Sequence, residues 1–241
     1  MTAEALTFSA DDRAGRTVFA LRGELTLRAT GRLRTALLKS IAEQPEALLV
    51  DLSRTSVPEP AALAVFTAVV RQAATWPGTP VLLCGAVPDV AGLLAGGGYG
   101  RMSLHDSVAA GLAMLDEGRE SLLFITDELL PVSGASRHAR NMVTEACGRW
   151  SLPQLAGPAS LVVSELVANV IDHVGTIMTL RISHRGRYLH LAVRDGSPVA
   201  PERSDRPGPS GLAMVDSLAT HWGWLPTRDG KVVWATLATD A

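Results

Sequence analysis

The sequence predicts two different domains, an α/β first half with a mixed sheet and packed helices and an α+β second half built in layers. Three observations lead to this prediction. In the first half, helical and strand-like segments alternate after two initial strands. The apolar pattern then breaks at 116–121 ("DEGRES"), and beyond the break two helical segments precede three strands. With 241 residues, we expect domains at 1–118 and 119–241.

The first half contains short apolar runs that are typical of buried strands, such as "ALLVDL" at 47–52 and "PVLLC" at 80–84. Longer segments with apolar residues at helical spacing lie between them. A turn is expected at 53–60, where polar residues and prolines gather. The expected strands are 5–9, 17–21, 47–52, 80–84 and 101–104, and the expected helices are 27–43, 61–74, 88–94 and 107–115.

The second half combines helices of about five turns with strands and one long polar loop. The loop, "GSPVAPERSDRPGPSG" at 196–211, is too polar to pack, and loops of this length are usually lids or binding loops. The expected strands are 122–127, 176–184, 188–195 and 232–236, and the expected helices are 132–150, 155–173 and 212–222.

The composition excludes several classes of protein. Hydrophobic residues make up 47% of the chain and charged residues 19%, which suffices for packed cores and argues against disorder. The net charge of −2 offers no basic surface to nucleic acid, and no apolar run reaches the ~18 residues of a membrane span. Cys84 and Cys147 stand too far apart in the sequence for a metal motif. We expect a cytoplasmic protein with reduced thiols, without nucleic-acid or membrane contact.

A polar row crosses the expected helix at 155–173. Glu165, Asn169 and His173 follow one another at four-residue spacing, so they lie on one side of a helix that is otherwise mostly apolar. A carboxylate can act as a general base, an amide oxygen can hold Mg²⁺ and an imidazole can reach a phosphate. The same row is also what a solvent-facing stripe of an amphipathic helix would show.

Two later segments favour a nucleotide-binding site over a solvent-facing stripe. Asp195 ends a strand and is followed by Gly196, so its carboxylate can accept a hydrogen bond from an amine such as adenine N6. "GPSGLAMV" at 208–215 closes the long loop and opens a helix, where small residues let backbone N–H groups face a phosphate. Each segment alone is also an ordinary turn signal.

In order, "SELVANVIDH" (164–173), "VRDGSP" (193–198), "PSGLAMVDSLATHWGW" (209–224) and "GKVVWATL" (230–237) resemble the motifs of the GHKL (Bergerat-fold) ATPases. They are most similar to those of the anti-sigma-factor serine kinases. The resemblance covers 122–237 and implies a GHKL two-layer α/β sandwich with ATP and Mg²⁺ as cofactors.

The resemblance also implies residue roles. Glu165 would be the catalytic base for phosphoryl transfer to a protein serine, Asn169 would hold Mg²⁺ through ATP, and Asp195 would bind the adenine amine. The other implied nucleotide-binding positions are His173, Gly196, Gly208, Gly211 and Leu212.

The motifs depart from the family pattern at three places. The segment after Asp195 lacks the two later glycines of the usual first glycine box, Pro209 stands where the lid must fold over phosphates, and Val232 replaces a threonine expected in the last strand. Proline fixes φ and removes an N–H donor, and loss of glycine hinders close approach of the backbone to a ligand. Several family members carry a degraded first box, so the resemblance still implies nucleotide binding, whereas it supports turnover less strongly.

The first half resembles a STAS domain, the fold of the anti-sigma-factor antagonists. The supporting segments are "VFALRGELTL" (18–27), "ALLVDLSRTSVPEPAAL" (47–63), "PVLLCGAVPDVAGLL" (80–94) and "MSLHDSVAAGLAML" (102–115). Family members carry a phosphoacceptor serine at the start of a helix. Aligned on Asp51, this sequence places Pro60 at that degenerate phosphoacceptor position. Proline suits a first helical turn but has no hydroxyl.

The loss of the acceptor predicts that the phosphorylation switch is absent while the helix start is kept. Ser53, Thr55 and Ser56 lie nearby and could serve as surrogate acceptors, although ordinary turn hydroxyls explain them better.

Three functions are compatible with these motifs. The chain could be an ATP-binding anti-sigma-factor-type regulator with serine kinase activity, a nucleotide-binding pseudokinase scaffold, or a pure protein-interaction module. The partners implied by the resemblance are a sigma factor, a separate STAS antagonist, or both. A homodimer and an intramolecular contact between the STAS and ATPase halves are left open.

Overall fold

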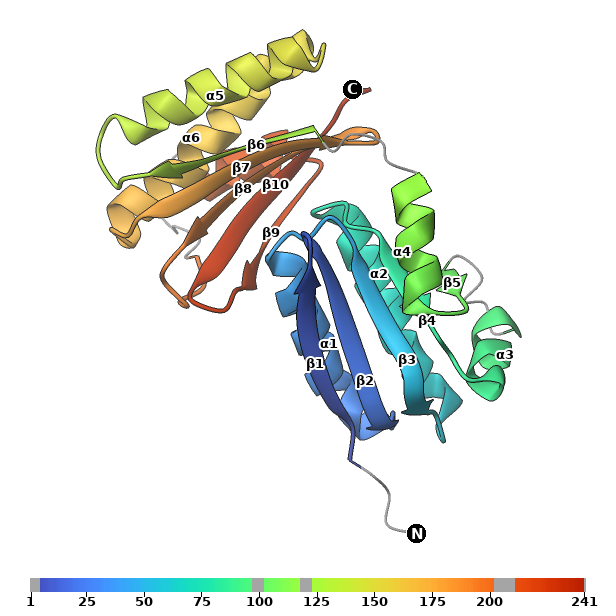
Figure 1. Cartoon of the computed structure of the whole chain (residues 1–241). Helices are drawn as coiled ribbons and strands as arrows, with labels where there is room; N and C mark the ends of the chain where they lie inside the picture. The colour runs from blue at the N-terminus through green and yellow to red at the C-terminus, as the bar shows by residue number, and fades with distance from the viewer. Residues whose placement is uncertain (1–4, 97–101, 118–122, 202–210, 241) are drawn as a thin grey trace. The chain divides into compact units, whose positions relative to one another are not determined.

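The computed structural model describes residues 5–96, 102–117, 123–201 and 211–240. The chain forms two units, Met1–Glu120 and Ser121–Ala241. Each unit contains a five-stranded sheet with helices packed on it (Figure 1).

The sheet of the first unit has the strand order β1-β2-β3-β4-β5. The first two strands pair antiparallel and the remaining pairs are parallel, so the sheet is mixed as the sequence predicts. Parallel neighbours require crossover connections, which the helices between them provide. The strands are β1 (Thr7–Arg13), β2 (Arg16–Glu24), β3 (Leu48–Ser56), β4 (Val81–Cys84) and β5 (Ser103–His105).

Helices cover both faces of this sheet. Helix α4 (Val108–Glu117) packs through Val108, Leu112 and Leu115 against a cluster that includes Leu49 and Leu82. Figure 1 shows α1 and α2 behind the opposite face. The remaining helices are α1 (Leu27–Ala42), the 3₁₀ turn η1 (Pro60–Leu63), α2 (Ala64–Thr75) and α3 (Pro88–Gly96).

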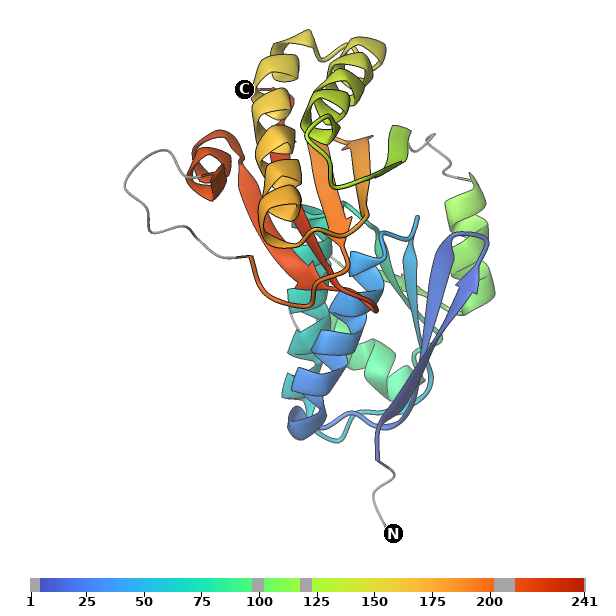
Figure 2. The same ribbon diagram turned by 90° about the vertical axis from the view of Figure 1, so that its left-hand side faces the viewer.

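The sheet of the second unit has the order β6-β7-β8-β10-β9, and every neighbouring pair is antiparallel. Helices α5 and α6 lie side by side over one face, as Figures 1 and 2 both show. This is a helix layer on a sheet layer. The strands are β6 (Leu123–Leu129), β7 (Met178–Arg185), β8 (Tyr188–Asp195), β9 (His221–Pro226) and β10 (Lys231–Ala238), and the helices are α5 (Ala135–Arg149), η2 (Pro153–Leu155), α6 (Ala156–His173) and α7 (Gly211–Leu218).

Helix α6 is the central helix of this layer. Its apolar residues recur at helical spacing, and Val162, Leu166 and Val170 are buried in the core of the unit. The segment Pro153–His173 is also long and apolar enough to cross a membrane by length and composition, which amends the sequence argument that no apolar run reaches such a length. The burial of its apolar face explains this composition as that of a core helix.

Two sequence predictions are wrong in detail. The helix expected at 212–222 ends at Leu218, and the chain continues as β9, an edge strand that the sequence analysis missed. The alternation of Trp222 and Trp224 around Gly223 is a strand pattern that could have revealed it. In the first unit, β3 runs on to Ser56, so the first half of the expected turn at 53–60 is strand.

Both cysteines are free and buried, in agreement with two reduced thiols. Burial, with a smaller contribution from the nearby Asp51 carboxylate, raises the pKa of the Cys84 thiol to about 11. Because the thiolate is the reactive form of cysteine, Cys84 is an unreactive residue that contributes to core packing.

Gly111 allows α4 to approach the first sheet closely. A Cβ atom at this position would lie 3.0 Å from Cys84 Sγ and 3.1 Å from a methyl carbon of Leu49. We expect Gly111→Val to lower the free energy of unfolding by about 1–3 kcal/mol through overpacking. Chemical denaturation followed by circular dichroism measures this change.

The matched control is Gly92→Val in α3, where nothing lies within 4 Å of the added Cβ. It should alter stability much less than Gly111→Val. Equal losses from the two substitutions would mean that helix propensity, and not packing against the sheet, sets the requirement for glycine.

Candidate functional site

The polar row of α6 exists as the sequence predicts. The helix is continuous over Ala156–His173, so Glu165, Asn169 and His173 lie on one side of it. Glu165 and Asn169 are half-buried, and His173 is exposed as the last residue of the helix. The row begins at the edge of the core and ends in solvent. Such a row can bind a ligand, or it can be the polar, solvent-facing side of the helix.

Asp195 ends β8 and is fully buried, with its side chain 0% exposed. Its Oδ1 atom accepts a hydrogen bond from the backbone N–H of Ser197 over 2.8 Å. The next residue, Gly196, donates its N–H to Thr176 Oγ1 over 3.1 Å. The turn after Asp195 is therefore held by local hydrogen bonds.

Lys231 is the residue that sequence reasoning missed. Its Nζ atom donates to Asp195 Oδ1 over 3.0 Å, and its side chain is 2% exposed. From the sequence, Val232 was taken to replace the threonine that the family pattern has in the last strand. In the structure, β10 pairs Lys231 with Asp195 and Val232 with Arg194. The signal was present: the chain has only two lysines, and one of them opens an apolar strand.

This pairing decides how well the site suits adenine. A purine amine needs a carboxylate oxygen that is free to accept its hydrogen bond. Asp195 Oδ1 already accepts from Ser197 and Lys231, while Oδ2 is buried without a partner in the described part of the chain. Oδ2 is therefore the acceptor at which an adenine amine would bind, and the role of Asp195 as adenine ligand stays a prediction. Mg²⁺ at Asn169 stays a prediction.

The phosphate end of the predicted site is described only in part. Gly208 lies outside the described residues, and Gly211 is the first residue of α7. Leu212 is buried in the core of the second unit, so its side chain anchors the start of α7.

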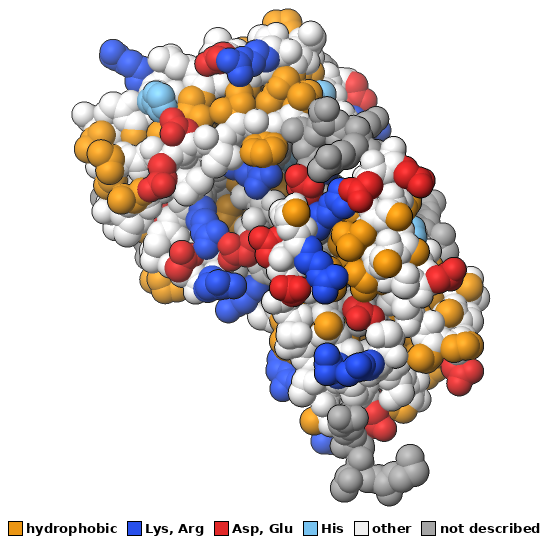
Figure 3. Space-filling view, viewed as in Figure 1, with side chains coloured by type: hydrophobic (Ala, Val, Ile, Leu, Met, Phe, Trp, Pro, Cys, Tyr) orange, Lys and Arg blue, Asp and Glu red, His pale blue; other side chains and the backbone are white. Residues whose placement is uncertain are grey.

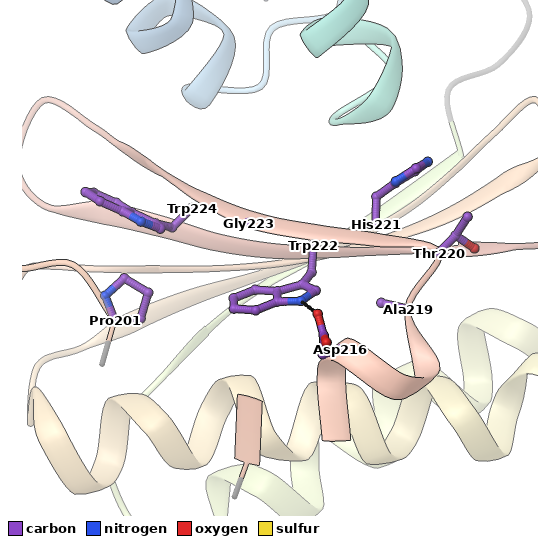
Figure 4. Close-up of a pocket in the computed structure, with 8 residues that line it drawn as sticks. All are labelled: Pro201, Asp216, Ala219, Thr220, His221, Trp222, Gly223 and Trp224. Atoms are coloured by element: carbon purple, nitrogen blue, oxygen red, sulfur yellow. Dashed lines mark hydrogen bonds between the residues drawn. The ribbon is translucent and has the colours of Figure 1, made fainter. Parts of the chain in front are cut away.

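A separate cavity of about 560 Å³ lies between α7 and β9 (Figure 4). Inside it, the indole Nε1 of Trp222 donates to Asp216 Oδ1 over 2.6 Å. None of its lining residues belongs to the site predicted from sequence. They are Pro201, Asp216, Ala219, Thr220, His221, Trp222, Gly223 and Trp224.

In the first unit, Pro60 is the first residue of η1, which leads directly into α2. The helix start is therefore kept at the position without a hydroxyl, as predicted. The neighbouring Glu59 accepts the backbone N–H of Leu27, the first residue of α1, over 2.8 Å. This bond places a carboxylate at the positive end of α1.

The three nearby hydroxyl residues differ in access. Thr55 is buried and its hydroxyl donates to Leu21 O over 3.2 Å, so it cannot meet a kinase in the folded state. Ser53 and Ser56 are exposed.

Across 5–96, 102–117, 123–201 and 211–240, no group of three or more His, Cys, Asp or Glu side chains could hold a metal ion.

No protein-family model matches the sequence, and no curated protein matches it either. Solved structures do match. An anti-sigma factor antagonist from Mycobacterium paratuberculosis is 20% identical, with a TM-score of 0.41, and covers 46% of this chain and 95% of its own. The unphosphorylated anti-sigma factor antagonist SpoIIAA is 16% identical, with a TM-score of 0.39, over 47% of this chain and 100% of its own. A sulfate transporter family protein from Wolinella succinogenes is 20% identical, with a TM-score of 0.38, over 44% and 88%.

The buried Asp195–Lys231 pair has a measurable effect on stability. Asp195→Ala leaves the Lys231 ammonium buried without its carboxylate, which costs about 3–5 kcal/mol. We expect a loss of that size in the free energy of unfolding from denaturant titration. The double variant Asp195→Leu/Lys231→Met should recover most of it, because neither charge is then buried.

Asp240→Ala is the control, because the pair between Asp240 and Arg187 is exposed on both sides and should contribute about 1 kcal/mol or less. If Asp195→Ala costs no more than Asp240→Ala, the ion pair between β8 and β10 is not formed as described.

Proposed function

We propose that the protein is a cytoplasmic regulator of the partner-switching type that acts by binding other proteins. In this proposal the first unit is a STAS-like module without its phosphoacceptor, and the second is a GHKL-like module. The partner is a sigma factor or a separate STAS antagonist, bound in a stoichiometric complex.

The observation that carries the proposal is Pro60 at the start of η1. The mixed sheet and its helices supply a folded binding module, and the helix that would carry the acceptor begins where the sequence predicts. Only the hydroxyl is missing. A module with an intact helix and no acceptor can bind a partner, but phosphate at this position cannot release it.

Surface charge supports a protein partner over nucleic acid. On the face drawn in Figure 3, Lys and Arg side chains alternate with Asp and Glu side chains on both units. The net charge of the chain is −2. Nucleic-acid binding depends on a basic patch or stripe that neutralises phosphates, whereas mixed charges suit a specific protein interface.

A second candidate function is an ATP-dependent protein serine kinase. It is supported by Glu165 and Asn169, which lie one turn apart on α6 and keep the order expected of a catalytic base and a Mg²⁺ ligand. Radiolabelled ATP with separate STAS proteins distinguishes the two candidates. Transfer of label that Glu165→Ala abolishes would establish the kinase, and absence of transfer together with partner capture supports the binding function.

The loss of the switch can be tested by restoring it. We expect Pro60→Ser to become a substrate when incubated with Mg²⁺, radiolabelled ATP and a serine kinase of the anti-sigma-factor family. Pro60 is exposed, and the substitution adds a hydroxyl at the helix start without filling the core. Mass spectrometry of the labelled peptide identifies the modified residue.

Pro58→Ser adds a hydroxyl two residues earlier, at another exposed position outside η1. It should stay unlabelled, as should the unmodified chain. Phosphate on Ser53 or Ser56 of the unmodified chain would contradict the proposed loss of the switch, because a surrogate acceptor would then operate.

A further inference from the structure

We propose that the cavity of about 560 Å³ between α7 and β9 binds an arginine side chain of the partner protein. The arginine lies on an extended segment of the partner that runs along β9, the last strand of the second sheet. The inference rests on the proposed binding function and names the chemistry that a partner has to offer. It does not depend on ATP, because the lining residues lie outside the nucleotide site predicted from sequence.

Two tryptophans of β9 contribute aromatic surface to this cavity. In the pairing of β9 with β10, Trp222 lies opposite Ala235. Two residues further on, Trp224 lies opposite Val233. Both of these β10 residues belong to the core, so the two indoles share the helix-facing side of β9. Their positions on the strand are about 6.6 Å apart, a spacing that suits one planar group stacked between them.

An aspartate of α7 supplies a negative charge at the edge of one indole. Trp222 Nε1 donates to Asp216 Oδ1 over 2.6 Å, and Figure 4 shows the carboxylate at the N–H edge of the ring. The second oxygen, Oδ2, forms no hydrogen bond or ion pair with the described residues. Because Asp216 is exposed, Oδ2 can accept a hydrogen bond from a donor outside the chain.

An arginine matches this combination of an aromatic face and a carboxylate. The face of an aromatic ring attracts cations, and tryptophan does so more strongly than tyrosine or phenylalanine. The guanidinium group is planar, stacks on aromatic rings and is more weakly hydrated than a lysine ammonium. With five N–H donors, it can donate to Asp216 Oδ2 while it lies against Trp222.

The edge of the sheet offers backbone contacts to the segment that carries the arginine. Thr227 N–H donates to Gly230 O over 2.9 Å where β9 joins β10, and hydrogen-bonded pairs alternate with non-hydrogen-bonded pairs from there. By this alternation, the N–H and C=O of Trp224 point away from β10, toward the outer edge. Its side chain is 38% exposed. An extended peptide adds to such an edge through main-chain hydrogen bonds, and a pocket beside the edge selects its side chain.

Titration of the full ¹⁵N-labelled chain with a short peptide, followed by NMR at the indole N–H signals, tests the proposal. The peptide has a central arginine flanked on each side by valine and threonine, which favour an extended backbone. We expect saturable shifts of the Trp222 and Trp224 signals. The signals of Trp76, which is buried in the first unit, and Trp150, which stacks on His184, should stay in place.

Peptide variants separate charge from shape. Citrulline in place of arginine keeps the planar group and removes the charge, so it should weaken binding at least about tenfold. Lysine keeps the charge and loses the planar group, so it should weaken binding about threefold.

Asp216→Asn is the matched variant of the protein. Its amide oxygen still accepts the Trp222 N–H, so the variant removes the charge and keeps this bond. We expect it to weaken peptide binding at least about fivefold. Asp240→Asn is the control, because it removes the same charge from an exposed aspartate that does not line the cavity. It should leave the affinity unchanged.

Any of five results would overturn the proposal. The first three are absence of saturable shifts at Trp222 and Trp224, equal binding of the arginine and citrulline peptides, and equal affinities of folded Asp216→Asn and Asp240→Asn. If N-acetylargininamide binds as tightly as the peptide, the occupant is a small cation. If the two indole signals shift with protein concentration alone, the occupant is a second copy of the chain. Should Asp216→Asn not fold, the two peptides on the unmodified chain still decide.

Capture of a sigma factor or a STAS protein is measured separately on the unmodified chain. Capture without peptide binding retains the proposed function and overturns this inference. Peptide binding without capture supports the arginine site and contradicts the proposed function.

Discussion

The ion pair between Asp195 and Lys231 is the constraint on which the second unit depends. It joins the ends of β8 and β10 inside the core face, where neither charge can return to water. Two buried charges are tolerated only as a pair, so residues 195 and 231 have to be considered together. The lysine takes only Oδ1 of the carboxylate, and Oδ2 is left without a partner among the described residues. One interaction thus holds this end of the sheet together and fixes the orientation of the Asp195 carboxylate.

The sequence predicted much of the fold because periodicity depends on local residues. The long helix α6, the strand β8 and the mixed first sheet all carry strong patterns of apolar residues. Strand β9 was missed because no glycine or proline separates the end of α7 from the Trp-Gly-Trp segment, and the chain leaves the helix there without a turn signal. Propensity alone does not locate such a boundary.

The candidate site was predictable residue by residue but not as a set of contacts. The row of Glu165 and Asn169 follows from helical spacing, whereas the partner of Asp195 depends on strand register. A shift of one residue in that register would have placed Val232 opposite Asp195 and Lys231 on another pair. The role of a single residue therefore remains a prediction where its hydrogen-bond partner comes from a neighbouring strand.

Pro60 has a consequence for how the protein would be controlled in the cell. A binder that carries an acceptor serine can be released from its partner by phosphorylation and used again. A binder with proline at that position has no such reset, so under the proposed function the occupancy of its partner follows mass action. Synthesis and degradation then become the means of control, and the response is graded by dosage and lasts for the lifetime of the polypeptide.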